Sequence, residues 1–230
     1  SELAKVCAST SVIVSAHTSL CCWPIYKYGT EDQKMKYLPE LLAGKKLGAF
    51  GLTKPNAGTD ASGQQTRAEL DGDEWVLNGA KCFITNGGYA EVFVVMAMTD
   101  KSKGNHGISA FIVEKNDPGF SIGKTEDKMG ICASSTTELI FQNCRIPKDR
   151  LLGGLGKGFK VAMQTLDGGR IGIASQALGI AEGALEVTIE YMKQRKQFGK
   201  KLAQMQALQF VVADLATKVE AAKLLVLKSA

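Results

Sequence analysis

The feature that most constrains the fold is a change of hydrophobic period along the chain. Residues 1–44 have helical character, and Thr30 followed by Gln33 matches a capping box. Across residues 47–147, short runs of Val, Ile, Phe and Thr alternate with turn residues, and no long helical pattern separates them. From about Gly158 apolar residues again recur at three- and four-residue steps. The expected order is therefore helix, strand, helix.

This order predicts an α+β protein with N-terminal helices, a central antiparallel β-barrel or sandwich, and a C-terminal helical bundle. We expect the divisions to fall at residues 1–46, 47–150 and 151–230. The chain starts without Met and still has a helical pattern at residues 227–230, with no stop signal. The first division is therefore expected to be the end of a helical domain, and the last the start of another.

Composition excludes several classes of protein. Hydrophobic residues make up 45% of the 230, enough for a core, and the net charge of +5 is spread along the chain. The six cysteines form no C-x-x-C pair and there are two histidines, which argues against a metal site and for free thiols in a reducing compartment. The longest apolar run, 92–98, is too short to cross a membrane. Aromatic residues, 7% of the total, are not interleaved with a basic run, so we expect no nucleic-acid partner.

One loop has the residue types of a ligand cradle. In the segment 50–60 a strand runs into a loop that contains Gly58 between two hydroxyl residues, Thr53 and Thr59. Glycine lets a ligand approach the backbone closely, and hydroxyl groups can bind carbonyl or phosphate oxygens. On composition alone, an ordinary turn around Pro55 explains the segment better.

Four segments together resemble the signatures of one enzyme family. Segment 50–60 resembles the flavin loop of the acyl-CoA dehydrogenases, and 81–87 resembles the second signature of that family. Segment 165–172 is similar to the CoA-binding helix, and 194–199 to the motif that reaches the flavin of a neighbouring subunit. The resemblance covers the whole chain, with the four segments in the right order. The sequence of residues 168–172 most resembles the short-chain, butyryl-CoA branch.

The resemblance implies a FAD site and an acyl-CoA site. Leu52 and Thr53 would hydrogen-bond the pyrimidine edge of the flavin, Phe83 would pack on the ring, and Thr85 would lie near N5. The full set implied to bind the cofactor is Phe50, Leu52, Thr53, Gly58, Thr59, Phe83, Ile84 and Thr85, with Arg195, Gln197, Phe198, Leu202 and Gln206 reaching a neighbouring subunit's FAD. The set implied to bind the substrate is Thr59, Asp167, Gly168, Gly169 and Arg170.

The residues alone leave plainer alternatives open. Phe83 can belong to an ordinary alternating strand and point inward. Asp167 and Arg170 can form an ion pair within one helix, and the basic segment 193–201 can be a solvated turn. Three glutamates spaced by four on the long helix are expected to form a solvated stripe: Glu182, Glu186 and Glu190.

The implied reaction is dehydrogenation of a short-chain acyl-CoA to a trans-2-enoyl-CoA, with electrons passed to an electron-transferring flavoprotein. In this family a Glu removes the α-proton, and we expect it beyond Ala230, so no catalytic residue is assigned here. Branches that place the base just before the helix arginine are excluded, because Gly169 stands there. The resemblance also implies a homotetramer in a bacterial cytoplasm or mitochondrial matrix. The alternative is a non-catalytic FAD- or CoA-binding fragment that lacks the base.

Two further expectations concern the neighbourhood of the ligands. The flavin loop of the family usually has an acidic residue where Lys54 stands here, so one charge beside the cofactor is reversed. By analogy, Leu20, Cys21, Cys22 and Trp23 are expected at the floor of the acyl pocket, where a bulky Trp favours short chains, although a plain core Trp fits equally well.

Overall fold

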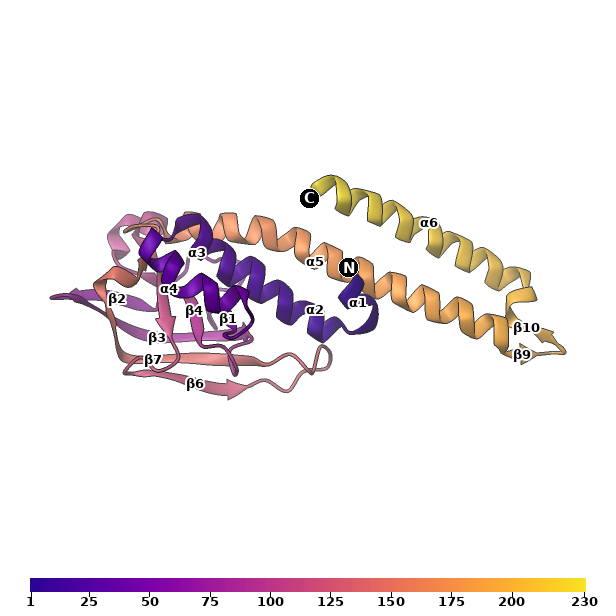
Figure 1. Cartoon of the computed structure of the whole chain (residues 1–230), viewed down its shortest axis with the longest axis horizontal. Coiled ribbons are helices and arrows are strands. Elements are labelled where there is room, and N and C mark those ends of the chain that lie inside the picture. The colour runs from indigo at the N-terminus through magenta and orange to yellow at the C-terminus, as the bar shows by residue number, and fades with distance from the viewer. The chain divides into compact units, whose positions relative to one another are not determined.

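The computed structural model describes all 230 residues, which divide into two compact units. One unit comprises residues 13–169 and contains the β-sheet. The other comprises residues 1–12 together with 170–230 and is helical apart from one short hairpin. Figure 1 shows the course of the chain from the N-terminus to the C-terminus.

The helical elements match the two zones expected from the sequence. In order they are α1 (Glu2–Val6), α2 (Ala8–Ser15), the π-helix η1 (Ala16–Cys22), α3 (Trp23–Tyr28), α4 (Glu31–Leu42), α5 (Gly158–Gln194) and α6 (Gln206–Ser229). Short 3-10 turns are η2 (Lys101–Gly107), η3 (Lys148–Arg150) and η4 (Leu202–Gln204).

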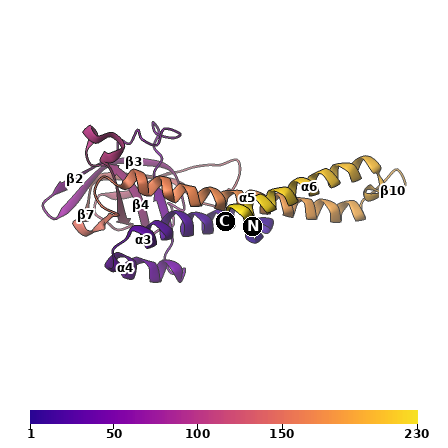
Figure 2. The same ribbon diagram turned by 90° about the horizontal axis from the view of Figure 1, so that it is seen from above.

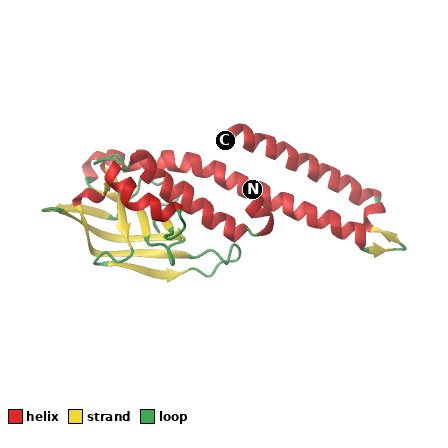
Figure 3. Cartoon of the chain, viewed as in Figure 1, coloured by secondary structure: helices red, strands yellow, loops and turns green.

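The strands lie almost wholly between these zones (Figure 3). They are β1 (Gly48–Gly51), β2 (Arg67–Asp71), β3 (Glu74–Thr85), β4 (Val92–Met98), β5 (Ile108–Glu114), β6 (Phe120–Thr125), β7 (Thr136–Pro147) and β8 (Leu151–Leu152), followed by the hairpin of β9 (Lys196–Gln197) and β10 (Lys200–Lys201).

Strands β1 to β8 form one sheet in the order β6-β7-β3-β2-β4-β5-β8, with β1 paired to β4. Most neighbours are antiparallel, as expected. The sheet also contains two parallel pairings, because β1 runs parallel to β4 over four residue pairs and β2 touches β4 in parallel at Arg67 and Met98. The β2–β3 hairpin lies between β1 and β4 in the sequence, so the chain returns to β4 in the same direction.

The sheet is buried on both faces of β4, which explains why its sequence is a continuous apolar run. Val92, Val94 and Met96 face a core shared with η1, α3, α4 and the start of α5. Phe93 and Val95 face a second core, formed with side chains of β3, β5 and β7. Alternate residues of a strand point to opposite faces, so a strand between two cores must be apolar throughout. The sheet thus encloses a core of its own, while helices α3 and α4 cover its other face (Figures 1 and 2).

Helix α4 begins and ends as the sequence predicts. The hydroxyl of Thr30 accepts the Gln33 N–H, and the Gln33 side chain accepts the Thr30 N–H, which confirms the capping box. After the helix, Gly44 has a left-handed backbone and its N–H bonds to the Leu41 carbonyl. Gln33 also donates to the Asp149 carbonyl and so ties the helix start to the turn η3 that follows β7.

The π-helix η1 has a local cause in the sequence. Pro24 has no N–H, and its ring would collide with the carbonyl one regular turn earlier. The chain adopts a wider turn before it, and the Trp23 N–H bonds to the Thr18 carbonyl five residues back. Within η1, His17 accepts the Gly48 N–H at Nδ1 (2.9 Å) and lies 3.1 Å from the Leu41 carbonyl at Nε2. This one side chain joins η1, the end of α4 and the start of β1.

The other unit corrects the expected solvated stripe on α5. Glu182 is only 8% exposed, and its carboxylate pairs with Lys5 of α1 at 3.2 Å and Lys223 of α6 at 3.4 Å. Glu186 and Glu190 are exposed, as expected. Helix α1 approaches α5 at Gly179 and Gly183, where an added Cβ would lie 2.2 and 2.4 Å from α1 backbone atoms. The sequence pattern of α5 alone did not reveal that two other helices supply cations at one of the three positions.

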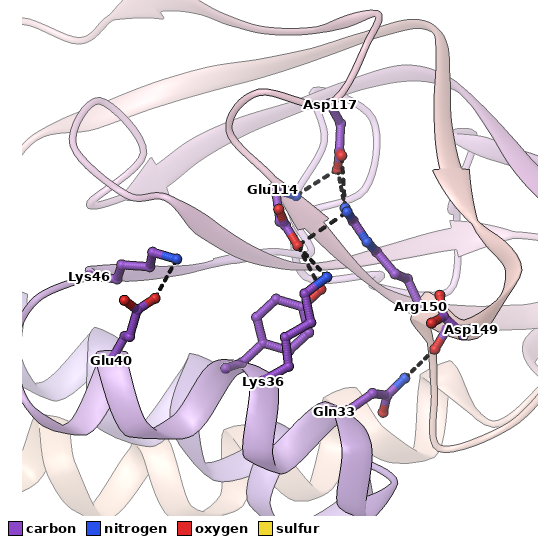
Figure 4. Close-up of polar contacts among 9 residues, drawn as sticks. Gln33, Lys36, Glu40, Lys46, Glu114, Asp117, Asp149 and Arg150 are labelled. Carbon is purple, nitrogen blue, oxygen red and sulfur yellow. Dashed lines mark hydrogen bonds and ion pairs between the residues drawn. The ribbon is translucent and has the colours of Figure 1, made fainter.

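A buried charge cluster fastens α4 to the sheet (Figure 4). Arg150 donates to Asp117 at 2.6 and 2.8 Å and pairs with Glu114 at 3.1 Å, while Tyr37 donates to Glu114 at 2.8 Å. Lys36 adds a pair with Glu114 at 3.0 Å. Burial raises the pKa of Asp117 even though the guanidinium opposes that shift. Arg150 is thus the cation that allows two carboxylates to lie under the helix.

We predict that Arg150→Met destabilises the protein by about 3 kcal/mol at neutral pH, because Asp117 and Glu114 lose their shared cation. The loss in free energy of unfolding, relative to wild type, should become smaller on acidification because Asp117 takes up a proton. The matched control is Arg145→Met, since Arg145 also pairs with two carboxylates, Asp71 and Glu74, but on the exposed surface. We expect that change to cost less than about 1 kcal/mol. Urea unfolding midpoints measure both, and equal losses would contradict the assignment.

Candidate functional site

The loop after β1 is fastened to strand β3, which brings together the two segments that resemble the flavin signatures. The Cys82 N–H donates to the Thr53 carbonyl at 3.0 Å. The Lys81 ammonium or amine nitrogen lies 3.1 Å from the Leu52 carbonyl, and the Gln64 amide donates to the same oxygen at 3.2 Å. Residues 52–64 therefore start and end on fixed points of the sheet.

A β-bulge turns Phe83 outward from the sheet. The pairing of β3 with β7 shifts between Lys81 and Ile84, with one residue more on β3 than on its partner. Phe83 has a left-handed backbone (φ 58°) and a side chain that is 62% exposed, whereas Ile84 is 2% exposed. The alternative of an ordinary strand with Phe83 inward is wrong. A large aromatic ring held outside the core, beside the 52–64 loop, is suited to stacking on a planar ligand.

Three hydroxyl groups implied at the site form no hydrogen bond within the chain. Thr53 and Thr85 are half-buried. Thr53 lies in the 52–64 loop, and Thr85 lies at the end of β3, opposite Thr136 of β7. Thr59 is exposed, as is Gly58, in the middle of the 52–64 loop. An added Cβ at Gly58 would meet nothing within 4 Å. The hydroxyl groups remain available to a ligand, although no contact links Thr59 to the other two. The remaining implied residue, Phe50, is half-buried on β1.

The substrate segment lies on α5. Asp167 and Gly168 are exposed and Gly169 is buried, where an added Cβ would lie 3.0 Å from Leu20 of η1. Arg170 follows on the same helix and is exposed. The implied positions thus fall beside η1, the only π-helix of the chain, and π-turns occur often at functional sites.

An apolar pocket of about 380 Å³ opens between η1, α3, α4 and α5. Of the residues expected at the floor of the acyl pocket, Cys22 and Trp23 line it, together with Gly168, whereas Leu20 does not. Cys21 does not line it: it is fully buried against Gly48, and burial raises the pKa of its thiol. Burial also raises the pKa of Cys22 to about 11, so neither thiol is a nucleophile at neutral pH.

The residues implied to reach a neighbouring subunit lie in the helical unit. Gln197 and Phe198 belong to the β9–β10 hairpin, Arg195 directly precedes it, and all three are exposed. Phe198 and Gly199 both have left-handed backbones, as a two-residue hairpin turn requires. Leu202 of η4 is half-buried, and Gln206 at the start of α6 is exposed. Within the chain these side chains form no shared pocket, and their role across subunits stays a prediction.

No group of three or more His, Cys, Asp or Glu side chains is arranged to hold a metal ion. No helix combines the length and apolar character needed to cross a bilayer.

The sequence analysis predicted residues that would face a ligand but missed the residues that hold the 52–64 loop and β1 in place. Lys81 and Gln64 are both buried and fix the Leu52 carbonyl from two sides. Asn86 is buried with a left-handed backbone, and its amide donates to the Gly48 carbonyl at 3.2 Å. A lysine in an apolar strand was the available signal for Lys81, since a lysine is almost never fully buried without a specific partner.

Comparison with known proteins assigns the fold to one family. Models of the acyl-CoA dehydrogenase N-terminal, middle and C-terminal domains match residues 1–45, 49–144 and 156–230 respectively. The chain belongs to the acyl-CoA dehydrogenase family.

Its relatives include short-chain members. The chain is 59% identical over 229 residues to the short-chain-specific acyl-CoA dehydrogenase of Clostridium acetobutylicum, and 54% identical over 228 residues to the acryloyl-CoA reductase (NADH) of Anaerotignum propionicum. It covers 60% and 58% of those proteins, and they cover 100% and 98% of this chain. The butyryl-CoA dehydrogenase structure from Megasphaera elsdenii matches 99% of the chain with a TM-score of 0.97 and 60% identity, over 60% of its own length. The chain therefore spans about 60% of the relatives it matches.

We predict opposite stability effects for two adjacent residues at the bulge. Phe83→Ala should change the free energy of unfolding by less than about 0.5 kcal/mol, because the ring is mostly in solvent. Ile84→Ala should cost about 2 to 4 kcal/mol, because it leaves a cavity in the second core. Denaturant unfolding without added flavin measures both. A larger loss for Phe83→Ala than for Ile84→Ala would contradict the outward position of the ring.

Proposed function

We propose that the protein is a FAD-dependent dehydrogenase of short-chain acyl-CoA thioesters, which forms the trans-2-enoyl-CoA. The observation that carries the proposal is the junction between the 52–64 loop and β3. There, Leu52 and Thr53 are held by their carbonyls while Phe83 is turned outward. Membership of the family, and the names of relatives about 60% identical, support the same activity.

The residues present fit a flavin. A planar ring needs an aromatic or apolar surface, and Phe83 offers an exposed one. The pyrimidine edge needs donors, and the Thr53 hydroxyl has no partner within the chain. The pyrophosphate needs room at the backbone, and Gly58 lies in open space. These are the features by which a protein binds and tunes such a group.

When bound, FAD supplies the acceptor for the β-hydride of the substrate. The part played by this chain is to bind and orient. The fixed carbonyls keep Thr53 in one place, so its hydroxyl is preorganised as a donor. Gly168 and Gly169 leave room beside η1 for the acyl group, and Asp167 and Arg170 are proposed to bind the CoA portion. The α-proton is proposed to go to a carboxylate outside residues 1–230, because Gly169 has no side chain to accept it.

The remaining assignments belong to the same proposal. Electrons would pass to an electron-transferring flavoprotein, and a chain from structural work on the electron transferring flavoprotein of Acidaminococcus fermentans is 61% identical with a TM-score of 0.97. A homotetramer would bring the β9–β10 hairpin to a neighbour's flavin. Bacterial relatives and a mitochondrial one from Bos taurus are consistent with a bacterial cytoplasm or a mitochondrial matrix. The divisions at 46/47 and 150/151 stay a prediction.

The first experiment is spectroscopic. We expect the purified full-length protein to show flavin absorption, and butyryl-CoA to bleach it as the flavin is reduced. A preparation without flavin that takes none up from added FAD would contradict the proposal. A flavin spectrum that no acyl-CoA bleaches would favour the alternative, a non-catalytic FAD- or CoA-binding protein.

Thr53→Val tests the loop directly. The change keeps the shape and removes the hydroxyl, and we expect FAD to bind roughly tenfold more weakly, the effect of one lost hydrogen bond to a ligand. The control is Thr188→Val, an exposed threonine of α5 whose hydroxyl bonds only to the Ala184 carbonyl one turn back. Fluorescence titration of the apoprotein with FAD measures both affinities. Equal affinities in the two variants would remove Thr53 from the site.

The pocket makes a prediction about chain length. Trp23 lines the apolar pocket of about 380 Å³, and its ring packs edge-on against Tyr28 at 5.8 Å. Trp23→Ala should enlarge the pocket and shift the ratio of kcat/KM values from butyryl-CoA toward hexanoyl- and octanoyl-CoA, by roughly tenfold for each two added methylenes that become buried, at about 0.8 kcal/mol per methylene. Steady-state kinetics across the acyl series measures the shift. A uniform loss for all chain lengths would place the acyl group elsewhere.

A further inference from the structure

Lys81 is a buried lysine that the proposed reaction does not use. Its side chain is 0% exposed on strand β3. The Nζ atom donates to the Leu52 carbonyl oxygen at 3.1 Å and to Oε1 of Gln64. No carboxylate lies within ion-pair distance of it. A lysine charge buried in this way would cost several kcal/mol in water-to-protein transfer, so its protonation state needs an explanation.

The hydrogen-bond geometry around Lys81 matches a neutral amine. An ammonium group has three N–H donors, whereas an amine has two. Two acceptors are present, the Leu52 carbonyl and Oε1 of Gln64. The orientation of the Gln64 amide is fixed independently, because its nitrogen donates to the carbonyls of Leu52 (3.2 Å) and Ala61 (2.9 Å). A third donor on Lys81 would be left unsatisfied in a dry site.

A second lysine stands beside the first. Lys54, at the start of the 52–64 loop, is 9% exposed, and its side chain has no hydrogen bond or ion pair. Burial lowers the pKa of Lys54, and burial together with the charge of Lys54 lowers the pKa of Lys81 well below its ordinary value. The other titratable group that acts on Lys81 is Cys82, whose own pKa burial raises. Glu138 and Glu126 raise the pKa of Cys82 but do not contribute to the pKa shift of Lys81.

We propose that Lys81 is the positioning residue of the 52–64 loop and acts as a neutral amine, kept neutral by Lys54. The assignment of that loop to flavin rests on the proposed function, whereas the protonation state of Lys81 does not. A neutral donor pair fixes the Leu52 carbonyl without placing a buried positive charge behind Thr53. An acid at position 54, as is usual in the family, would instead make Lys81 an ammonium and the two residues an ion pair.

The proton balance gives the first test. With its pKa depressed in the folded state, Lys81 binds a proton only on unfolding, so the unfolded state binds more protons and stability rises with pH. Between the depressed pKa and the ordinary value of 10.5, the unfolding equilibrium constant should fall about tenfold for each unit of pH increase. Lys81→Met should abolish this dependence, and Lys54→Glu should flatten it by raising the pKa of Lys81. The measurement is urea unfolding of the full-length apoprotein over a pH series.

Charge-conserving replacement gives the second test. Arginine stays charged in proteins, so Lys81→Arg should raise the unfolding constant more than Lys81→Met does, although arginine is the more conservative change. The matched control is Lys128, which also donates to two oxygens, the Ser134 carbonyl at 2.6 Å and the Thr136 hydroxyl at 2.8 Å, but is only half-buried. Lys128→Arg should leave the unfolding constant within about threefold of wild type.

Four outcomes are distinguished. A pH-dependent unfolding constant that Lys81→Met removes, together with FAD binding at least tenfold weaker in that variant, supports the proposal. A pH-independent wild type, or a Lys81→Arg variant as stable as wild type, overturns it, because Lys81 would then be charged. FAD binding that is unchanged in a folded Lys81→Met variant overturns the positioning role. If the wild type binds no FAD at all, the proposed function fails, while the pH series still decides the protonation state.

Discussion

The site depends on two backbone carbonyls that a neighbouring strand holds in place. The loop of residues 52–64 would otherwise sample many conformations, and ordering it opposes folding through lost entropy. The Cys82 N–H, the Lys81 nitrogen and the Gln64 amide bond the carbonyls of Thr53 and Leu52, so the loop inherits the rigidity of β3. A ligand that binds there meets donors already in position and need not spend binding energy on ordering them.

The periodicity and capping signals in the sequence are local, and they predicted what local chemistry determines. The capping box at Thr30 and Gln33, the turn at Phe198-Gly199 and the helical period from Gly158 all follow from nearby residues. The bulge at Phe83 could not be predicted in this way, because it arises from the register between β3 and β7, which are some fifty residues apart. Burial of Glu182 is equally nonlocal, since its partners Lys5 and Lys223 come from opposite ends of the sequence.

Two buried basic residues of the sheet unit, Arg150 and Lys81, have opposite electrostatic surroundings. Around Arg150 the cation is matched by Asp117 and Glu114, so each desolvated group has a partner of opposite charge. Around Lys81 no anion is present, and the partners are a carbonyl and an amide oxygen. A side chain in the second environment lowers its energy by losing the proton. The difference explains why a lysine is tolerated in the middle of the sheet, where neutral hydrogen-bond donors are enough.

The ligand-facing surfaces depend on missing side chains as much as on those present. Gly48 allows β1 to lie against Cys21, where an added Cβ would come within 2.5 Å of the sulfur. Gly169 of α5 lies opposite Leu20, which belongs to the same π-helix η1 as Cys21. Gly168 lines the apolar pocket. The π-helix therefore packs against β1 on one side and against the 165–172 segment of α5 on the other. The wider turn comes directly before Pro24, so a residue outside the 50–60 and 165–172 segments accounts for the local geometry of the helix that lies between β1 and the apolar pocket.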